Sequence, residues 1–224
     1  MVGPARCCSS PGGASPPPEL GIAWTAVAEK DLKISAYSMV TVDQLCCLDG
    51  LIWLQSGQAV GALTRQHQTT VSRNQRKCAR TLGVDVLKRD GFWRIEGDSQ
   101  LLELERRVHQ AARLKLGQGL RLEATVTSGT NLAREIEDAW IVGSSRLQKP
   151  THFAALLRQR VIDAWLLHGT QGPETSEAIV SLPLGDDPEA MRLLVHRDLA
   201  QQPAIQTLVE SLVALQPPVL PREP

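Results

Sequence analysis

The sequence predicts an α/β protein with a mainly helical N-terminal part, a connecting helix and a small C-terminal part built on a mixed or parallel sheet. Three observations predict this. Residues 41–82 carry apolar side chains at helical spacing, residues 98–116 form another long helical pattern, and residues 120–215 alternate apolar runs with helical patterns. The 224 residues, 42% hydrophobic and 21% charged, are typical of a globular protein of one large or two small domains.

Composition and patterning divide the chain into five parts. The first is dominated by Pro, Gly, Ser and Ala, so we expect a disordered extension. The others are a helical domain, a connecting helix, an α/β domain and a tail. The expected boundaries are 1–38, 39–97, 98–117, 118–216 and 217–224.

Several classes of protein are excluded. No apolar run approaches the roughly 18 residues of a membrane span, and the first residues lack the apolar core of a secretory signal, so we expect a cytoplasmic protein with no membrane partner. The five cysteines include two adjacent pairs and have no histidine cluster at zinc spacing, so we expect reduced thiols, no metal and no cofactor. We expect Cys78 to serve core packing.

Catalytic motifs are missing from the sequence. It contains no GxSxG, HExxH, Walker A or strand-linked GxGxxG pattern. Asp163, His168 and the pair Asp186 and Asp187 form no convincing acid–base group, because Asp163 falls inside a predicted strand. We therefore expect a protein that is not an enzyme.

The first helix is predicted by its cap. Thr41 followed by Gln44 is a capping-box pattern, and apolar residues keep a helical period to residue 54. Residues 59–64 predict a short helix, residues 65–68 a turn and residues 69–82 a second helix. Gly61 stands ten residues before Val71, where a small residue lets the two helices cross closely. This order is a helix-turn-helix.

Basic charge is concentrated on that last helix and its surroundings. Residues 57–89 hold seven Lys or Arg against one acid, although the whole chain balances 24 against 24. Val71, Cys78 and Leu82 form an apolar stripe, while another face carries Thr70, Arg73, Asn74 and Lys77. Such hydroxyl, amide and cationic groups hydrogen-bond base edges and neutralise phosphates, which predicts a DNA-reading helix. The alternative is a solvated surface helix.

A hairpin is predicted next. Gly83 ends the helix, residues 84–87 begin a strand, and Arg89-Asp90-Gly91 forms a turn before a strand at 92–95. Arg89 or Arg94 would reach a phosphate or, less readily, a minor groove.

These segments resemble a known family. HQTTVSR is similar to the S-Q-P-A-V-S-R segment of LysR-type transcriptional regulators, and LGVDVLKRDGFWRIEG resembles the wing segment that follows it there. The resemblance implies a winged helix-turn-helix in which Gln68, Thr69, Ser72 and Arg73 face double-stranded DNA and Arg89 is the wing-proximal arginine. With the helical face above, the expected DNA contacts are Gln68, Thr69, Thr70, Ser72, Arg73, Asn74, Arg76, Lys77 and Arg89.

The connecting helix carries an apolar seam. Leu101, Leu104, Val108 and Ala111 repeat at spacings of three, four and three, which suits pairing with a second copy or packing on the same chain. LysR-type proteins have a dimerising linker helix at this place, so the resemblance implies a homodimer.

The C-terminal part has a different charge. Residues 57–116 hold 12 basic and 6 acidic residues, net +6, whereas residues 120–224 hold 9 and 13, net −4. We expect a largely parallel sheet with helices near 131–137, 152–160 and 203–215, and a loop rich in Gly, Pro and acids between 167 and 191. The sheet is expected to bind no DNA.

This part resembles, over a shorter length, the effector domain of the same family. VIDAWLLHG and LLVHRDLAQQPAIQTLVESL carry the resemblance, but about a hundred residues provide one lobe of the two. Ser128 and Thr130, at the start of a predicted helix, could hold the carboxylate of a small organic acid effector; a plain helix cap is the alternative.

The function expected from these observations is transcription regulation. We expect a sequence-specific DNA-binding regulator of LysR-like type that acts as a dimer. The alternative is a non-catalytic interaction module that pairs with another regulator instead of binding DNA.

Overall fold

The structure, a computed structural model, describes residues 40–124, 136, 139–168, 177–185 and 191–215. All of them fall within one compact unit of the chain. The extension and the tail expected from composition lie outside the described residues, as do Ser128, Thr130 and most of the helix expected at 131–137. No helix in the described ranges is long and apolar enough to cross a membrane.

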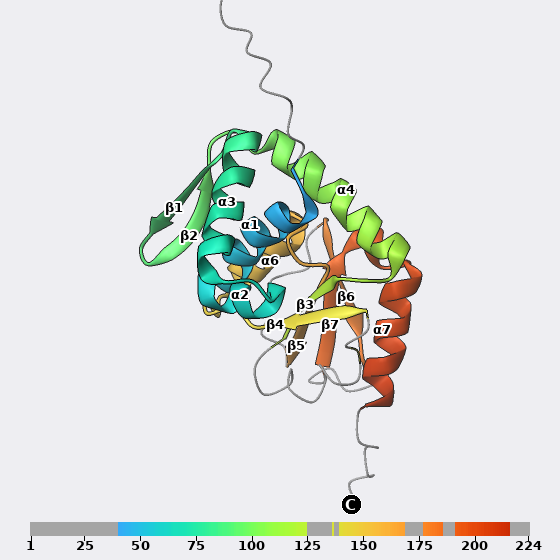
Figure 1. The fold of residues 1–224 in the computed structure, drawn as a ribbon. Coiled ribbons are helices and arrows are strands. Elements are labelled where there is room, and N and C mark those ends of the chain that lie inside the picture. The colour runs from blue at the N-terminus through green and yellow to red at the C-terminus, as the bar shows by residue number, and fades with distance from the viewer. Residues whose placement is uncertain (1–39, 125–135, 137–138, 169–176, 186–190, 216–224) are drawn as a thin grey trace, which may run out of the picture. The chain divides into compact units, whose positions relative to one another are not determined.

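Three helices and a hairpin form the N-terminal part (Figure 1). The backbone N–H of Gln44 donates to Thr41 Oγ1 at 3.3 Å, which confirms the predicted cap. The hairpin turns through Asp90 and Gly91, both with positive φ, as a two-residue turn requires. The elements are α1 (Val42–Leu54), α2 (Gly57–Thr64), α3 (Gln68–Leu82), β1 (Asp85–Arg89) and β2 (Phe92–Glu96).

Gly61 makes a close approach, but to a different segment from the one predicted. A Cβ at this position would lie 2.7 Å from the carbonyl oxygen of Gln66 in the α2–α3 turn, not against Val71. The backbone N–H of Gln66 donates to Gly61 O at 2.9 Å, so the turn folds back onto α2. The glycine therefore shapes the turn that positions α3.

The connecting helix, α4 (Gln100–Leu116), has two unlike faces. Leu102, Arg106 and Gln110 are buried, at spacings of four. Leu101, Leu104 and Val108 are 60%, 52% and 65% exposed on the opposite side. The predicted apolar seam therefore points away from the rest of the described chain, and a largely polar face packs inward.

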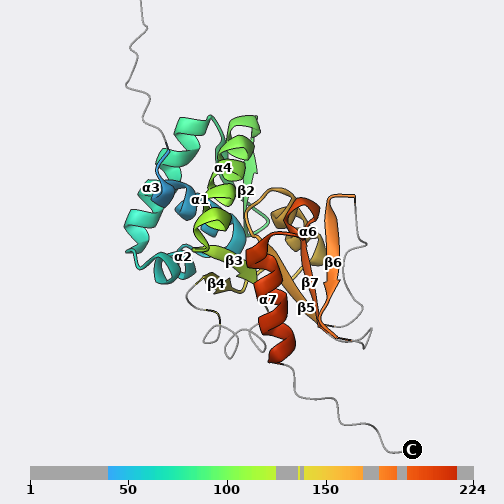
Figure 2. The ribbon, with the colours of Figure 1, turned by 90° about the vertical axis from the view of Figure 1, so that its right-hand side faces the viewer.

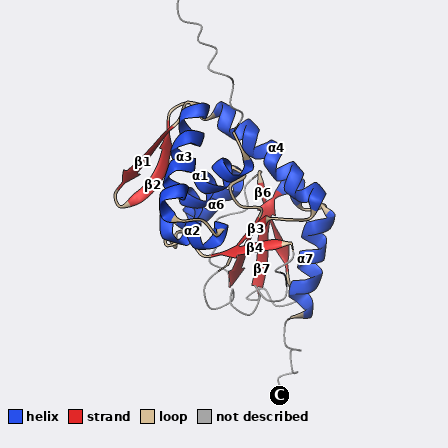
Figure 3. Ribbon diagram, viewed as in Figure 1, coloured by secondary structure: helices blue, strands red, loops and turns tan. Residues whose placement is uncertain are grey.

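The C-terminal part contains a five-stranded sheet in the order β4-β3-β5-β7-β6 (Figures 1 and 3). Three helical segments accompany it: α6 (Pro150–Arg158), the short 3₁₀ helix η1 (Arg197–Leu199) and α7 (Pro203–Ala214). The strands are β3 (Leu120–Glu123), β4 (Trp140–Gly143), β5 (Ala164–His168), β6 (Ile179–Pro183) and β7 (Met191–His196).

The expectation of a largely parallel sheet is wrong, because the sheet is mixed. β3 runs parallel to β4 and β5, whereas β7 runs antiparallel to both β5 and β6. β6 lies in the segment that composition alone assigned to a loop. Only residues 184–190 join β6 to β7, and a parallel crossover needs about a dozen residues or more, so this pair can only be antiparallel.

Helices cover both faces of the sheet (Figure 2). Leu208 and Leu212 of α7 pack with Leu122, Leu166 and other residues on one face. On the other face, α6 residues pack with Trp165 and Leu194. The alternation of Leu193 and Leu194 between the two clusters follows from the period of two along a strand.

The hydrophobic core is continuous between the N-terminal helices and the sheet. Leu51, Trp53 and Val60 belong to the same buried cluster as Phe153 and Trp165. A separate cluster joins α1, α3 and α4, with Cys78 fully buried at its centre. Burial raises the pKa of the Cys78 thiol to about 12, so this residue serves packing, as predicted.

Candidate nucleic-acid interface

The exposed face of α3 carries most of the predicted contact residues. Its polar side chains surround a surface hollow of about 530 Å³. The lining residues are Thr69, Ser72, Arg73, Arg76, Lys77 and Arg80. Because Val71, Gln75, Cys78 and Leu82 occupy the buried face of the same helix, helical geometry alone turns these side chains outward.

The cations of this face have no acidic partners within the described part of the chain. Among the ion pairs of the described residues, none includes Arg73, Arg76, Lys77 or Arg80. By contrast, Arg89 and Arg106 each pair with a carboxylate. Unpaired, solvated guanidinium and ammonium groups in one row are suited to an extended anion such as a nucleic-acid backbone.

The start of α3 is held by its own side chains. His67 is the N-cap, and its Nδ1 lies 2.9 Å from Thr69 Oγ1 and accepts from the Thr69 backbone N–H at 3.4 Å. Gln68 and Thr70 stand exposed in this first turn. In this first turn the side chains of Gln68 and Thr70 are therefore open to solvent, whereas the Thr69 hydroxyl lies within hydrogen-bond distance of His67.

Asn74 faces inward, unlike its predicted neighbours. Its Nδ2 donates to Gln66 Oε1 at 3.2 Å and lies 3.8 Å from Cys47 Sγ. Cys47 Sγ in turn lies 3.5 Å from the same Gln66 oxygen. In this structure Asn74 ties α3 to the turn and to α1, so it stands apart from the outward-facing row.

Arg89 is exposed but paired across the hairpin. Its Nε and Nη2 donate to the two carboxylate oxygens of Glu96 at 2.7 and 3.1 Å. The hydrogen bond from Arg89 is the main reason that the pKa of Glu96 lies below its ordinary value. Arg89, beside the turn, therefore ties β1 to the far end of β2, and any phosphate there would compete with Glu96.

A second hollow, of about 760 Å³, lies between α3, the hairpin and the start of α2. One glutamine fixes the hairpin beside it. Gln55 Oε1 accepts from the Trp93 backbone N–H at 2.6 Å, and Gln55 Nε2 donates to Trp93 O at 3.1 Å. Arg76, Arg80 and Lys88 contribute positive charge to this hollow.

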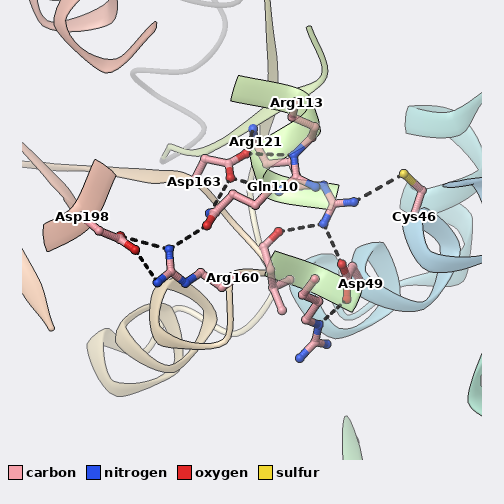
Figure 4. A network of polar contacts seen from close by, with 10 residues as sticks. Cys46, Asp49, Gln110, Arg113, Arg121, Arg160, Asp163 and Asp198 are labelled. Atoms are coloured by element: carbon pink, nitrogen blue, oxygen red, sulfur yellow. Dashed lines mark hydrogen bonds and ion pairs between the residues drawn. The ribbon is translucent and has the colours of Figure 1, made fainter. Parts of the chain in front are cut away.

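Beneath this surface, buried ion pairs connect α1 to the sheet and to α4 (Figure 4). Asp49 accepts from Arg106 Nε at 2.8 Å and from Arg121 Nη1 at 2.9 Å. Burial alone would raise the pKa of Asp49, but the two guanidinium groups outweigh it and hold the pKa below its ordinary value. This carboxylate is therefore ionised and fully engaged.

Asp163 is the second acid of the same network. It accepts from Gln110 Nε2 at 2.8 Å, from Arg113 Nη2 at 2.9 Å and from the Arg121 backbone N–H at 2.8 Å. Gln110 extends the network further, because its Oε1 accepts a hydrogen bond from Arg160 Nη1 at 2.8 Å. Arg160 in turn pairs with Asp198 (Figure 4). Asp163 is structural here, with all its oxygens occupied.

Sequence reasoning did not find this network. Its residues on the inward face of α4 have long polar side chains, which from sequence alone are expected to be exposed to solvent. Its acids lie 57 and 50 residues from Arg106 and Arg113 along the chain. The one usable signal was the polar spacing of Arg106, Gln110 and Arg113 on the face opposite the apolar seam.

A second buried contact joins α1 to the sheet. Trp53 Nε1 donates to Glu123 Oε2 at 2.6 Å, and the Ser145 backbone N–H donates to both carboxylate oxygens at 3.1 and 3.2 Å. Glu123 is 1% exposed and has no cationic partner among the ion pairs of the described residues. Burial raises its pKa to about 7.

This carboxyl group predicts a pH-dependent stability. Its pKa is about 7 in the folded chain and 4.5 ordinarily, so between these values the folded chain holds a proton that the unfolded chain has lost. The stabilisation of the folded chain by this raised pKa is fully present below pH 4.5. It amounts to roughly 3 kcal/mol of unfolding free energy and is lost as pH rises from 4.5 to 7. We expect Glu123→Gln to abolish this loss and to be more stable than the parent chain at pH 8.

Urea unfolding at several pH values would measure the effect. His152 lies 3.5 Å from Ser145 Oγ, and burial lowers its pKa below the ordinary value, so the difference between the parent chain and Glu123→Gln isolates Glu123. His152→Asn provides the control, which should keep the decline between pH 4.5 and 7. Parallel pH profiles for the parent chain and Glu123→Gln would contradict the prediction.

Among the described residues, no group of three or more His, Cys, Asp or Glu could hold a metal ion. Cys46, Cys47 and Cys78 are free thiols.

Comparison with known proteins returned matches only among solved structures. No protein-family model and no curated protein matches the chain. The chain is similar to an OxyR mutant of Corynebacterium glutamicum, at 16% identity and a TM-score of 0.34 over 65% of this chain and 51% of that one. It is also similar to CrgA, a LysR-type transcriptional regulator of Neisseria meningitidis, at 13% identity and a TM-score of 0.29 over 65% and 53%.

A third similar structure is LysG of Corynebacterium glutamicum with bound effector Arg, at 15% identity and a TM-score of 0.29 over 63% of this chain and 54% of that one. The chain spans about half the length of each of these proteins.

Proposed function

We propose that this protein is a sequence-specific DNA-binding transcriptional regulator of LysR-like type. In this proposal residues 39–97 form a winged helix-turn-helix, with α3 in the major groove and the β1–β2 hairpin as the wing. Residues 98–117 form the linker helix, and residues 118–216 form a shortened regulatory domain. The observation that carries the proposal is the row of cations on the exposed face of α3, which have no acidic partner among the described residues.

The dimensions of α3 support this role. Its 15 residues span about 22 Å at 1.5 Å per residue, enough to cross a major groove that is about 12 Å wide. Arg73 and Lys77 lie one turn apart on its outer face. Arginine is suited to two-pronged contact with guanine, whereas lysine acts as a point charge on phosphate.

The chain is proposed to act as a homodimer through α4. Its exposed leucines and valine form a continuous apolar row, and large exposed apolar rows on soluble chains mark contact sites. A two-fold dimer would present two α3 helices to two half-sites of one duplex. A small organic acid at Ser128 and Thr130 is the effector that the sequence suggests.

The two cations of α3 should differ in their effect. We expect Arg73→Ala to weaken binding to the preferred duplex by about 1–3 kcal/mol and to relax sequence preference, because it removes a base contact. Lys77→Ala should weaken binding to all duplexes alike and reduce the salt dependence, because it removes a phosphate contact. Fluorescence anisotropy with a duplex enriched from a randomised pool and with a random duplex, over a salt series, measures both.

Arg158→Ala, at an exposed position at the end of α6, is the control for loss of one positive charge. Equal effects of Arg73→Ala and Lys77→Ala on both duplexes would refute the assignment of roles. If the full chain binds no duplex but forms a stable complex with another regulator, the interaction module is the better description.

A further inference from the structure

One arginine of the C-terminal part lies at the second hollow, beside the N-terminal helices. Arg146 follows β4 in the chain and lines the hollow together with Ser56, Gly57 and Gln58 from the start of α2. Gln68, Ser72 and Arg76 of α3 and Lys88 of the hairpin line the same hollow. Among the described residues of 120–215, Arg146 is therefore the cation that contributes to this lining.

The backbone around Arg146 is fixed by buried contacts. Ser145 is 2% exposed, and its N–H donates to the Glu123 carboxylate. The Arg146 N–H donates to Leu54 O, at the C-terminal end of α1, at 3.5 Å. The following N–H, of Leu147, donates to Ser145 Oγ at 3.2 Å. The segment that carries Arg146 is thus attached to α1 just before α2 begins, while the Arg146 side chain is exposed.

The charge of the hollow selects an anion. Arg76, Arg80, Lys88 and Arg146 face one acid, Asp85, among its lining residues. None of the four cations takes part in an ion pair of the described chain. Lys88 Nζ instead lies 5.9 Å from the centre of the Trp93 ring, which leaves its positive charge available.

The place of the hollow indicates which anion. It flanks α3 on the side of the hairpin, and a helix that enters a major groove has a sugar–phosphate strand along each flank. A strand on this flank would pass over the hollow between α2 and the hairpin. The four cations are spread over three separate segments of the chain, which suits a row of phosphates better than one compact ion.

Resting on the proposed function, we propose that Arg146 contacts a DNA phosphate and that the DNA-binding surface therefore extends from the winged helix-turn-helix onto the C-terminal part. The contact is electrostatic and independent of sequence. Because the Ser145 N–H donates to Glu123 and the Arg146 N–H donates to Leu54 O, the sheet itself holds this contact in register with α3.

The test is the salt dependence of binding by the full chain. We expect Arg146→Ala to weaken binding severalfold, equally for a duplex enriched from a randomised pool and for a random duplex. The slope of log K against log salt concentration should fall in magnitude by about 0.9, the value for one phosphate contact. Arg146→Lys should restore most of the slope, because the positive charge is retained. Arg158→Ala, an exposed arginine at the end of α6, should leave affinity and slope unchanged.

The outcomes separate this inference from the proposed function. If Arg73→Ala weakens binding while Arg146→Ala leaves the slope unchanged, the inference is overturned and the proposed function stands. Loss of sequence preference in Arg146→Ala would also overturn it, since a phosphate contact reads no base. If the parent chain binds neither duplex, the inference about Arg146 and the proposed function are both refuted. A hollow that takes free phosphate or a small organic acid, with the DNA slope unaffected by Arg146→Ala, would identify a small-anion site instead.

Discussion

Replacement of Asp49 by Ala is expected to destabilise the protein by about 3–5 kcal/mol, the cost of removing one partner from a buried ion pair. Asp49 is 1% exposed, and its two partners, Arg106 and Arg121, are 2% and 5% exposed at the side chain. Without the carboxylate both guanidinium groups would remain buried with their positive charges uncompensated. One Arg106 nitrogen, Nη2, already has no hydrogen-bond partner in the described structure.

Chemical unfolding monitored by tryptophan fluorescence would measure this loss. Asp198→Ala is the matched control, because Asp198 also pairs with an arginine but its side chain is 55% exposed. Solvent can replace Asp198 around Arg160, so the control should lose far less stability. A triple change of Asp49, Arg106 and Arg121 to apolar residues of similar size should recover much of the loss. Equal small losses for Asp49→Ala and Asp198→Ala would contradict the role assigned to the buried pair.

Introduction of charge into the exposed row of α4 is expected to separate the proposed dimer. Leu104→Glu combined with Val108→Glu would place two carboxylates at positions that are 52% and 65% exposed in the single chain. Folding should be unaffected, since neither side chain packs in the core. In a paired state the same carboxylates would be buried against apolar residues, which is costly.

Light scattering during size exclusion would give the mass, and anisotropy the affinity for DNA. We expect a monomer whose affinity for a two-half-site duplex falls by about 10²-fold or more, because the second half-site no longer binds at high effective concentration. Val213→Glu is the control, since Val213 is an exposed apolar residue of α7 outside the row. A variant that stays dimeric would show that α4 does not form the interface.

The parts of the fold that local physics determines were predictable from the sequence. The Thr41 cap, the αL residue Gly83 after α3 and the Asp90-Gly91 turn each act within a few residues, and all three are present. β6 was missed because most of its neighbourhood is rich in Gly, Pro and acids, which favour a loop. Its antiparallel orientation against β7 follows from the short connection between them, but only once β6 itself is recognised as a strand.

The candidate site likewise has positions that the sequence predicts and positions that only the packed chain determines. The outward positions of Arg73, Arg76 and Lys77 follow from helix period, so the sequence was sufficient for them. The inward turn of Asn74 depends on Gln66 and Cys47, which only the packed chain brings near it. Arg146 lies in the part with net negative charge, and nothing in its surroundings along the chain indicates a place beside α2.

The close packing of Trp53 against Gly143 has a consequence for chimaeras between this protein and others. A Cβ at residue 143 would lie 2.5 Å from Trp53 Cζ2 and 3.0 Å from Leu54 Cδ2, closer than packed carbon atoms can approach. The end of α1 and the end of β4 are therefore shaped to each other. A chimaera that joins these N-terminal helices to a sheet from another protein would also need a strand end shaped to fit Trp53. The two parts of this chain therefore cannot be exchanged independently.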